Sequence, residues 1–423
     1  MKGKAAFDIL IIGGGAAGLF AAAFLKTYAP DILFAVAEKT NPGTKLLMTG
    51  GGRCNISNNK SPRDLKDGFY EAGSFIYRSI KTFSPEDACR FIREELKVRL
   101  KEEEDNKIFP ASDKASEILE RLISKTGEKN ILRDTEIKDI RKKGDVFEMK
   151  TASGETIEAE QILIATGGMS FPATGSDGFI YRFCEKEGLR SVPPLPAIAG
   201  FILDGEDRKT AAGLAGVTAD PVKAALYIEG KKAAEAEGSL LFTHKGISGP
   251  AVMALSRYVR TDALKDTCIE LDLIPDIKEE DFNKGFDNMQ TKTVNALPAG
   301  LPRAVRSELL KLLEIPEDTY VKDLRKGQRR ELYKTCKALS FKICQLPPLT
   351  TATVTRGGIS LKEINRETME IIKIPGAYVA GEALDADGRS GGYNLQLAMS
   401  TAYSAVTGMI KSKRNRDNKE DET

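Results

Sequence analysis

The sequence contains no tryptophan, and His244 is the single histidine among its 423 residues. A metal site built from several histidines is therefore excluded. The cysteines argue against a zinc site and a redox-active dithiol, since no two of them are spaced as C-x-x-C. They are Cys54, Cys89, Cys184, Cys268, Cys336 and Cys344. We expect reduced thiols, no bound metal and a cytoplasmic location.

Strong net charge and long apolar runs are missing too. With 63 basic and 61 acidic residues, the net charge of +2 gives no general reason to expect a nucleic acid or a membrane as a partner. Residues 9–25 are uncharged, but this stretch is too short for a membrane span and contains consecutive glycines. What remains is an ordinary globular composition, 41% hydrophobic and 29% charged, in a chain long enough for two or three domains.

The most informative stretch comes first, FDILIIGGGAAGLF, and opens with a buried strand at residues 9–12. Gly13, Gly15 and Gly18 follow with the spacing G-x-G-x-x-G. Gly13 permits a tight turn, Gly15 lets the backbone approach a pyrophosphate, and Gly18 allows the helix to pack closely on the sheet. The pattern predicts a dinucleotide-binding site.

The residues after the motif complete this unit. A helix beginning near Ala16 would point its free N–H groups and its positive dipole end at the phosphates. A second apolar run at residues 32–37 ends in Glu38. A carboxylate there accepts hydrogen bonds from the ribose hydroxyls of adenosine and repels a 2′-phosphate. Residues 7–39 therefore predict a βαβ unit that binds a dinucleotide.

A second glycine run lies in LLMTGGGRCNISNN, residues 46–59. The glycines at 50–52 can form a nest of backbone N–H groups that faces an anion. Arg53 could add a charge-assisted contact to the same phosphates, and Asn55 a donor and an acceptor for a flat heterocycle. The alternative is a flexible surface loop.

The segment QILIATGGMS predicts another ligand-binding turn. Residues 162–165 form a buried strand, and the turn that starts with Thr166 and Gly167 follows it. Ligands of open α/β sheets lie beyond the carboxyl ends of the strands.

A second helix start, at Gly391 and Gly392, precedes a helix expected at 395–410. A flavin gains negative charge at its pyrimidine edge on reduction, so a helix N-terminus aimed there favours it. NAD requires no second helix start, and the pair therefore favours FAD. The alternative is that these glycines only cap a helix that packs on the sheet.

We expect an α/β fold, a Rossmann-like FAD-binding domain of the glutathione-reductase type, interrupted by an inserted β-barrel-like plus helical domain. An amphipathic helix is expected at 74–100, and the charged tail should be disordered. The expected boundaries are 1–193 and 349–410 for the FAD-binding domain, 194–348 for the insert (β part 194–275, helical part 276–345) and 411–423 for the tail.

Together these segments resemble a bacterial flavoprotein family with a two-dinucleotide-binding type FAD fold, whose members include a 3-dehydro-bile-acid Δ4,6-reductase and an aminoacetone oxidase. The matching segments span nearly the whole chain, and TGGGRCN with GGYNLQ is a specific combination. Ile137 would hold the adenine through its backbone, which its sequence context does not indicate. The FAD contacts that the resemblance implies are Gly13, Gly15, Ala16, Gly18, Glu38, Lys39, Gly52, Arg53, Asn55, Ile137, Ala165, Thr166, Gly167, Glu382, Gly392, Asn394 and Leu395.

For catalysis, His244 is the candidate proton donor beside the flavin, because imidazole titrates near neutral pH. It lies in FTHKGISGP, at the start of an expected helix, where a turn or cap hydrogen bond is the alternative role. Arg389 could bind an anionic substrate or simply lie on the surface. Cys54 has no second cysteine or base nearby in the sequence, so a thiol mechanism is not expected.

We expect an FAD-dependent oxidoreductase in which NAD(P)H reduces the flavin and flavin N5 passes hydride to an activated C=C bond of an enone. The steroid-like substrate class comes from the resemblance alone. One alternative is a flavin oxidase of a small amine or aminoketone such as aminoacetone. Another is an RNA-modifying flavoprotein. Acids are interleaved with the basic residues at 303–330, so a small molecule, rather than a nucleic acid, is the expected partner.

Overall fold

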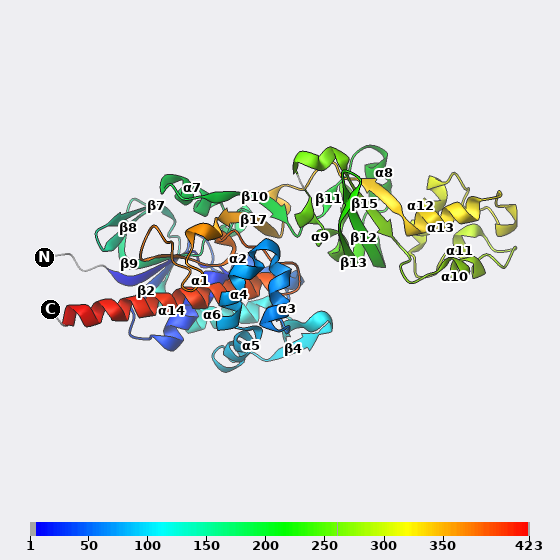
Figure 1. Ribbon diagram of the computed structural model, residues 1–423. Helices are drawn as coiled ribbons and strands as arrows, with labels where there is room; N and C mark the ends of the chain where they lie inside the picture. The colour runs from blue at the N-terminus through cyan, green and yellow to red at the C-terminus, as the bar shows by residue number, and fades with distance from the viewer. Residues whose placement is uncertain (1–5, 260, 422–423) are drawn as a thin grey trace. The chain divides into compact units, whose positions relative to one another are not determined.

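The computed structural model describes residues 6–259 and 261–421. The chain forms two compact units (Figure 1). Unit 1 consists of Met1–Leu195 and Val354–Thr423, and unit 2 of Pro196–Thr353. Each unit has a hydrophobic core of its own.

Unit 1 is built on a seven-stranded sheet. Its strands are β1 (Phe7–Ile12), β2 (Phe34–Ala37), β6 (Ile131–Leu132), β7 (Ile137–Lys143), β8 (Val146–Thr151), β9 (Thr156–Ile164) and β18 (Ala377–Val379). The order is β6-β2-β1-β9-β8-β7, and β18 also pairs with β9. β6, β2, β1, β9 and β18 are parallel, whereas β8 is antiparallel to both of its neighbours. The parallel strands are buried along most of their length, as expected for a sheet covered on both faces.

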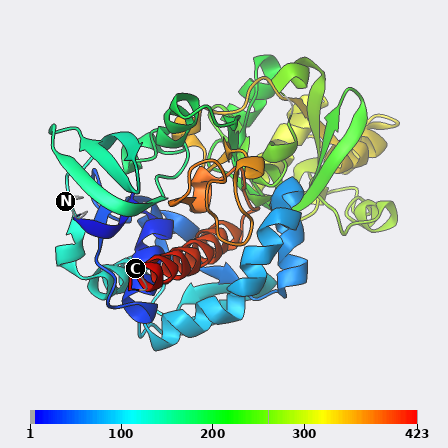
Figure 2. The same cartoon turned by 60° about the vertical axis from the view of Figure 1, so that its left-hand side comes forward.

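The helices of unit 1 include one from each end of the chain, α1 and α14. The helices are α1 (Ala16–Tyr28), α2 (Thr44–Leu47), α3 (Pro62–Lys66), α4 (Gly73–Thr82), α5 (Pro85–Glu94), α6 (Ala115–Thr126), α7 (Phe179–Lys186) and α14 (Tyr393–Asp421). α14 packs against α1 and α4 and crosses the middle of the unit (red in Figure 2). Among the described residues, no helix is long and apolar enough to cross a membrane.

Two small sheets complete unit 1 and its junctions with the insert. The first has the order β3-β5-β4, and the second pairs β10 with β17. Their bounds are β3 (Ser57–Asn58), β4 (Leu100–Glu103), β5 (Lys107–Pro110), β10 (Ser191–Ala197) and β17 (Val354–Ile359).

The prediction of one continuous helix at 74–100 is wrong, because α4 ends at Thr82 and α5 begins at Pro85. Ser84 starts the second helix with a capping box: its hydroxyl accepts from the Asp87 N–H, and the Asp87 carboxylate accepts from the Ser84 N–H. The hydrophobic periodicity continues across the break, which is why the pattern alone hid it.

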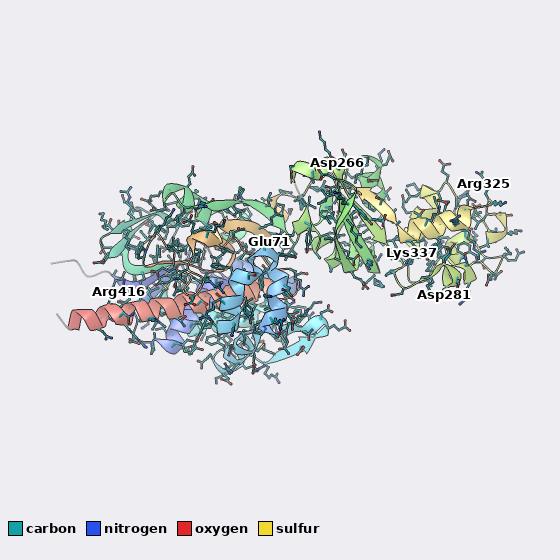
Figure 3. All side chains as sticks on the ribbon, in the orientation of Figure 1. Glu71, Asp266, Asp281, Arg325, Lys337 and Arg416 are labelled. Atoms are coloured by element: carbon teal, nitrogen blue, oxygen red, sulfur yellow. The ribbon has the colours of Figure 1, made fainter. Side chains whose placement is uncertain are left out.

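The prediction of a disordered tail from residue 411 is also wrong, since α14 continues to Asp421. Lys413 places its ammonium 3.1 Å from Asp8 at the start of the sheet and 3.1 Å from Glu160 of β9. Arg416, which is labelled on α14 in Figure 3, also pairs with Glu160, at 3.5 Å. Ion pairs with the sheet thus hold a helical segment that has no apolar face of its own.

Unit 2 combines an antiparallel sheet with a set of helices. The sheet order is β11-β14-β13-β12-β15-β16. The bounds are β11 (Phe201–Ile202), β12 (Thr218–Ile228), β13 (Lys231–Thr243), β14 (Gly246–Ser248), β15 (Thr267–Asp272), β16 (Leu339–Lys342), α8 (Gly205–Gly213), α9 (Pro250–Met253), α10 (Glu279–Lys284), α11 (Thr293–Ala296), α12 (Arg303–Leu312) and α13 (Gln328–Lys337). α10 to α13 lie in the chain between β15 and β16, which pair with each other. The predicted α/β class, a Rossmann-like domain with a β and helical insert, is confirmed.

Candidate functional site

The carboxyl ends of β1, β2, β9 and β18 meet at one edge of the unit 1 sheet, because these strands are parallel neighbours. Predicted ligand-binding residues follow each strand at that edge. They are Gly13, Gly15, Ala16 and Gly18 after β1, Glu38 and Lys39 after β2, Ala165, Thr166 and Gly167 after β9, and Glu382 after β18. Ligands of open α/β sheets bind in this position.

The glycines after β1 have different steric surroundings. A Cβ on Gly13, whose φ is 103°, would lie 2.6 Å from the carbonyl oxygen of Ala165, and one on Gly18 only 1.9 Å from the carbonyl oxygen of Gly13. A Cβ on Gly15 would meet nothing within 4 Å. Gly13 and Gly18 are therefore required by the fold itself. The space beside Gly15 is open at the start of α1, which begins at Ala16 without a side-chain cap and can offer its N–H groups to a phosphate.

Glu38 is buried and fixed at the end of β2. Its carboxylate accepts hydrogen bonds from the backbone N–H groups of Gly14 and Thr40, each at 2.7 Å. The N–H of Thr135 donates to its carbonyl oxygen at 2.9 Å, which brings the segment leading into Ile137 beside it. The residues predicted to hold ribose and adenine thus lie close together.

Lys39 forms an ion pair with Asp177 at 3.0 Å. Burial alone would raise the pKa of Asp177, but the charges of Lys39 and Arg182 outweigh burial and lower that pKa. A Cβ on Gly175 would lie 3.6 Å from the Lys39 side chain. The loop after β9 therefore covers the end of the site where Glu38 lies.

Thr166 carries a hydroxyl that the protein does not satisfy. Its Oγ1 is buried and has no hydrogen-bond partner among the residues that the structure describes. The preceding residue, Ala165, is fixed by its N–H donating to Ile12 at 2.9 Å, and Gly167 turns the chain with a φ of 71°. An unsatisfied buried hydroxyl costs about 1–3 kcal/mol, so a polar ligand there would remove the penalty. With the open space at Gly15, this residue set fits the ribityl and pyrophosphate groups of FAD.

Arg53 makes several contacts within the protein, and its contact with FAD stays a prediction. Its guanidinium donates to Asp113 at 2.8 Å, pairs with Glu103 and lies 4.2 Å from the ring centre of Phe109. Two carboxylates and an aromatic face satisfy the cation within the protein. Gly52 keeps a positive φ of 88° and remains exposed.

The start of α14 is held by the protein's own groups. In the amide orientation that satisfies its neighbours, Asn55 accepts from the Gly392 N–H at 3.3 Å. A Cβ on Gly392 would lie 2.3 Å from the backbone of Ser57, so this glycine is required for packing against β3. Asn394 uses its amide to bridge the N–H and the carbonyl of Gly388, at 2.9 and 2.7 Å. Leu395 lies in the first turn of the helix.

A polar cluster that the sequence did not predict lies at this edge and is formed by Lys45, Ser170, Thr355 and Glu382. The Lys45 ammonium lies 2.7 Å from one Glu382 oxygen and 2.5 Å from the Ser170 hydroxyl. The other Glu382 oxygen accepts from the Ser170 hydroxyl at 2.7 Å and from the Thr355 N–H at 2.8 Å. Lys45 and Glu382 are 337 residues apart, and no local pattern joins them.

Burial alone would raise the pKa of Glu382, but the charge of Lys45 and the hydrogen bonds from Ser170 and Thr355 outweigh it and lower that pKa. Glu382 was predicted as an FAD contact. Its carboxylate accepts hydrogen bonds from the protein, and its contact with FAD stays a prediction.

His244 does not start a helix, contrary to expectation. It is exposed in the tight turn between β13 and β14 of unit 2. The Thr243 hydroxyl closes this turn by donating to the Gly246 carbonyl at 3.0 Å and accepting from its N–H at 3.1 Å. The role of His244 as a proton donor stays a prediction.

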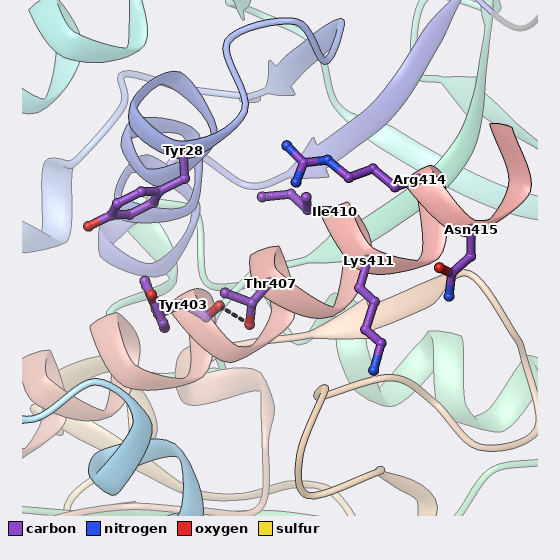
Figure 4. A pocket seen from close by; sticks show the side chains of 7 residues that line it. All are labelled: Tyr28, Tyr403, Thr407, Ile410, Lys411, Arg414 and Asn415. Carbon is purple, nitrogen blue, oxygen red and sulfur yellow. Dashed lines mark hydrogen bonds between the residues drawn. The ribbon is translucent and has the colours of Figure 1, made fainter. Parts of the chain in front are cut away.

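A shallow groove of about 430 Å³ lies elsewhere in unit 1, along the second half of α14 (Figure 4). None of the predicted site residues lines it. Its lining residues are Tyr28, Tyr403, Thr407, Ile410, Lys411, Arg414 and Asn415. Over the described ranges, no group of three or more His, Cys, Asp or Glu side chains could hold a metal ion.

Comparison with known sequences identifies relatives along almost the whole chain. The sequence profile described as "HI0933-like protein Rossmann domain" matches residues 7–408. The chain is 30% identical to the ribosomal RNA dihydrouridine synthase of Escherichia coli, over 96% of this chain and 99% of the other. It is 31% identical to the Haemophilus influenzae protein of the same name, over 94% and 97% of the two chains. It is 30% identical to the 3-dehydro-bile acid delta(4,6)-reductase of Clostridium scindens, over 93% and 97%.

Proposed function

Since this chain belongs to the HI0933-like Rossmann-domain family of FAD-binding oxidoreductases, we propose that it reduces a C=C bond conjugated to a carbonyl group. The observation that carries the proposal is the chemistry shared by its relatives. Forming dihydrouridine saturates the ring double bond of uracil, which is conjugated to a carbonyl. A delta(4,6)-reductase of a 3-dehydro steroid acid likewise acts on double bonds conjugated to a ketone.

The residues of the carboxyl edge would hold the cofactor. The open start of α1 beside Gly15 would bind the pyrophosphate, Glu38 the adenosine ribose, and the unpartnered Thr166 hydroxyl a polar atom of the ribityl chain. When bound, FAD supplies hydride transfer at its N5 atom. NAD(P)H is the proposed electron donor.

For the substrate, we favour a uracil base in ribosomal RNA. Beside the start of α14, Lys107 pairs with Asp105 at 2.9 Å, and the positive charges of Lys60 and Arg389 also act on that carboxylate. The Asn58 amide ties this group to the helix start by donating to Asp105 at 2.8 Å and to Gly391 at 3.3 Å. Three cations surround a single acid there, and the resulting excess of positive charge suits the phosphates of a polynucleotide. This proposal ranks RNA above the small molecule that the sequence favoured.

A steroid-like enone is the second candidate, because one relative of similar identity is named for such a substrate. Both candidates require the same hydride transfer, and they differ only in what surrounds the reacting double bond.

The experiment is to reduce the purified flavoprotein anaerobically with NADPH or NADH and to mix it with one substrate at a time. Unmodified ribosomal RNA transcript should reoxidise the flavin and gain two hydrogens per reacting uridine by mass spectrometry. A transcript without uracil is the control. If a 3-keto-Δ4 steroid reoxidises the flavin and the RNA does not, the second candidate substrate is supported in place of the first. Failure of both substrates, or reduction of the flavin by aminoacetone in preference to NAD(P)H, would overturn it.

A further inference from the structure

The cluster of Lys45, Ser170, Thr355 and Glu382 ties together four separate parts of unit 1. Lys45 belongs to α2, and Thr355 to β17. Ser170 follows β9, and Glu382 follows β18, its neighbour in the sheet. The cluster therefore lies just beyond the carboxyl ends of two adjacent parallel strands, where the cofactor is proposed to bind.

The pair of Lys45 and Glu382 is largely withdrawn from water, with side-chain exposures of 23% and 20%. Taking two charges out of water costs several kcal/mol per ion, and an apolar pair of the same size often stabilises a protein as well or better. A buried ion pair is therefore weak evidence of a purely stabilising role. A charge at a ligand-binding edge can act on the ligand.

A second observation at the same place is the hydroxyl of Tyr181, on α7. It is buried and has no hydrogen-bond partner among the residues that the structure describes. Burial raises the pKa of Tyr181, and the negative charges of Glu382 and Asp385 raise it further. Like Thr166, Tyr181 carries a buried polar atom without a protein partner, which a bound ligand would satisfy.

We propose that Lys45 provides a fixed positive charge that stabilises bound FAD in its reduced state, and that Glu382, Ser170 and Thr355 position its ammonium. The inference rests on the proposed function, since it requires FAD at this edge. Two added electrons make the flavin more negative, so a nearby cation favours the reduced form and a nearby anion opposes it. Lys45 is mobile as a free side chain, but two acceptors hold its ammonium in place.

The test measures the midpoint potential of the bound flavin in the full-length holoprotein, together with the affinity for oxidised FAD and the thermal unfolding of each variant. We expect K45M to weaken the binding of reduced FAD at least tenfold relative to oxidised FAD, which lowers the midpoint potential by about 30 mV. K45R should stay close to the wild type. E382Q, which removes the negative charge, should shift the potential in the opposite direction.

The matched control is K413M. Lys413 is also a partly buried lysine of unit 1, with 18% exposure and three carboxylate partners, but it lies at the amino end of β1. K413M should leave the midpoint potential unchanged even where it lowers thermal stability.

Opposite shifts in K45M and E382Q would support the inference, because a merely structural ion pair would change both variants in the same sense. Equal potentials in the wild type and K45M, or shifts of one sign in both variants, would overturn it. If K45M binds no FAD, the E382Q variant decides the test by itself. An unchanged or lowered midpoint potential in E382Q would then overturn the inference. A wild-type protein that binds no FAD would instead refute the proposed function together with this inference.

Discussion

At the scale of single residues, two glycines of one motif are present for different reasons. The space around Gly18 is filled by the carbonyl of Gly13, whereas that around Gly15 is empty. The motif predicts that Gly18 serves packing and that Gly15 lets the backbone approach a pyrophosphate; the structure shows the close contact at Gly18, and the role of Gly15 stays a prediction. That distinction depends on what packs against each Cβ position.

This distinction gives a paired prediction. G18A should destabilise unit 1 by about 1–3 kcal/mol, because its methyl group would have to displace backbone. G15A should leave the free energy of unfolding nearly unchanged and weaken FAD binding. Urea denaturation of the FAD-free proteins and titration with FAD measure the two effects. Equal stability losses in both variants would contradict the assignment.

Glu382 provides a prediction about pH. Its pKa is below the ordinary value of 4.5 in the folded protein, so the charged form is favoured by folding. The stabilisation is therefore fully present above pH 4.5 and is lost as the pH falls below that value. The difference in free energy of unfolding between wild type and E382Q should be largest near neutral pH and should narrow in acid. Urea denaturation at a series of pH values checks this, and a constant difference would refute it.

At the scale of elements, the sequence predicted the strands and glycine turns of the Rossmann-like domain well, because apolar runs and glycines act locally. It failed where the determining contact is distant or small. Polar residues after 411 indicated disorder, yet Lys413 reaches two carboxylates of the sheet. The cluster around Lys45 was not predicted because its members are far apart in the sequence. The acidic partners of Arg53, Asp113 and Glu103, were not predicted because they lie outside its segment.

The break between α4 and α5 was missed because one serine creates it. Ser84 caps α5 through a capping box, and such caps contribute about 1 kcal/mol. S84A should therefore lower the free energy of unfolding by about that amount without changing FAD affinity. The control is S153A, in the exposed turn after β8, which should have little effect. Chemical denaturation of both variants measures the difference, and equal effects would argue against the cap.

At the scale of the whole molecule, the two units have separate hydrophobic cores, and the proposed cofactor residues of the carboxyl edge all belong to unit 1. We expect two unfolding transitions in calorimetry. FAD at 100 times its dissociation constant should stabilise unit 1 by about 2.7 kcal/mol and leave the other transition in place. A single transition that moves as a whole on addition of FAD would contradict independent cores.

The packing of α1 against α14 has a consequence for how the protein is made. α1 begins at Ala16 and α14 at Tyr393, so unit 1 needs both ends of the chain. A ribosome completes all of unit 2 before it synthesises the helix that covers α1. Until then the apolar side chains of α1 lack the cover that α14 provides, and such transiently exposed surface favours aggregation. A chain that stops before Tyr393 lacks this helix, so we expect it to bind FAD poorly.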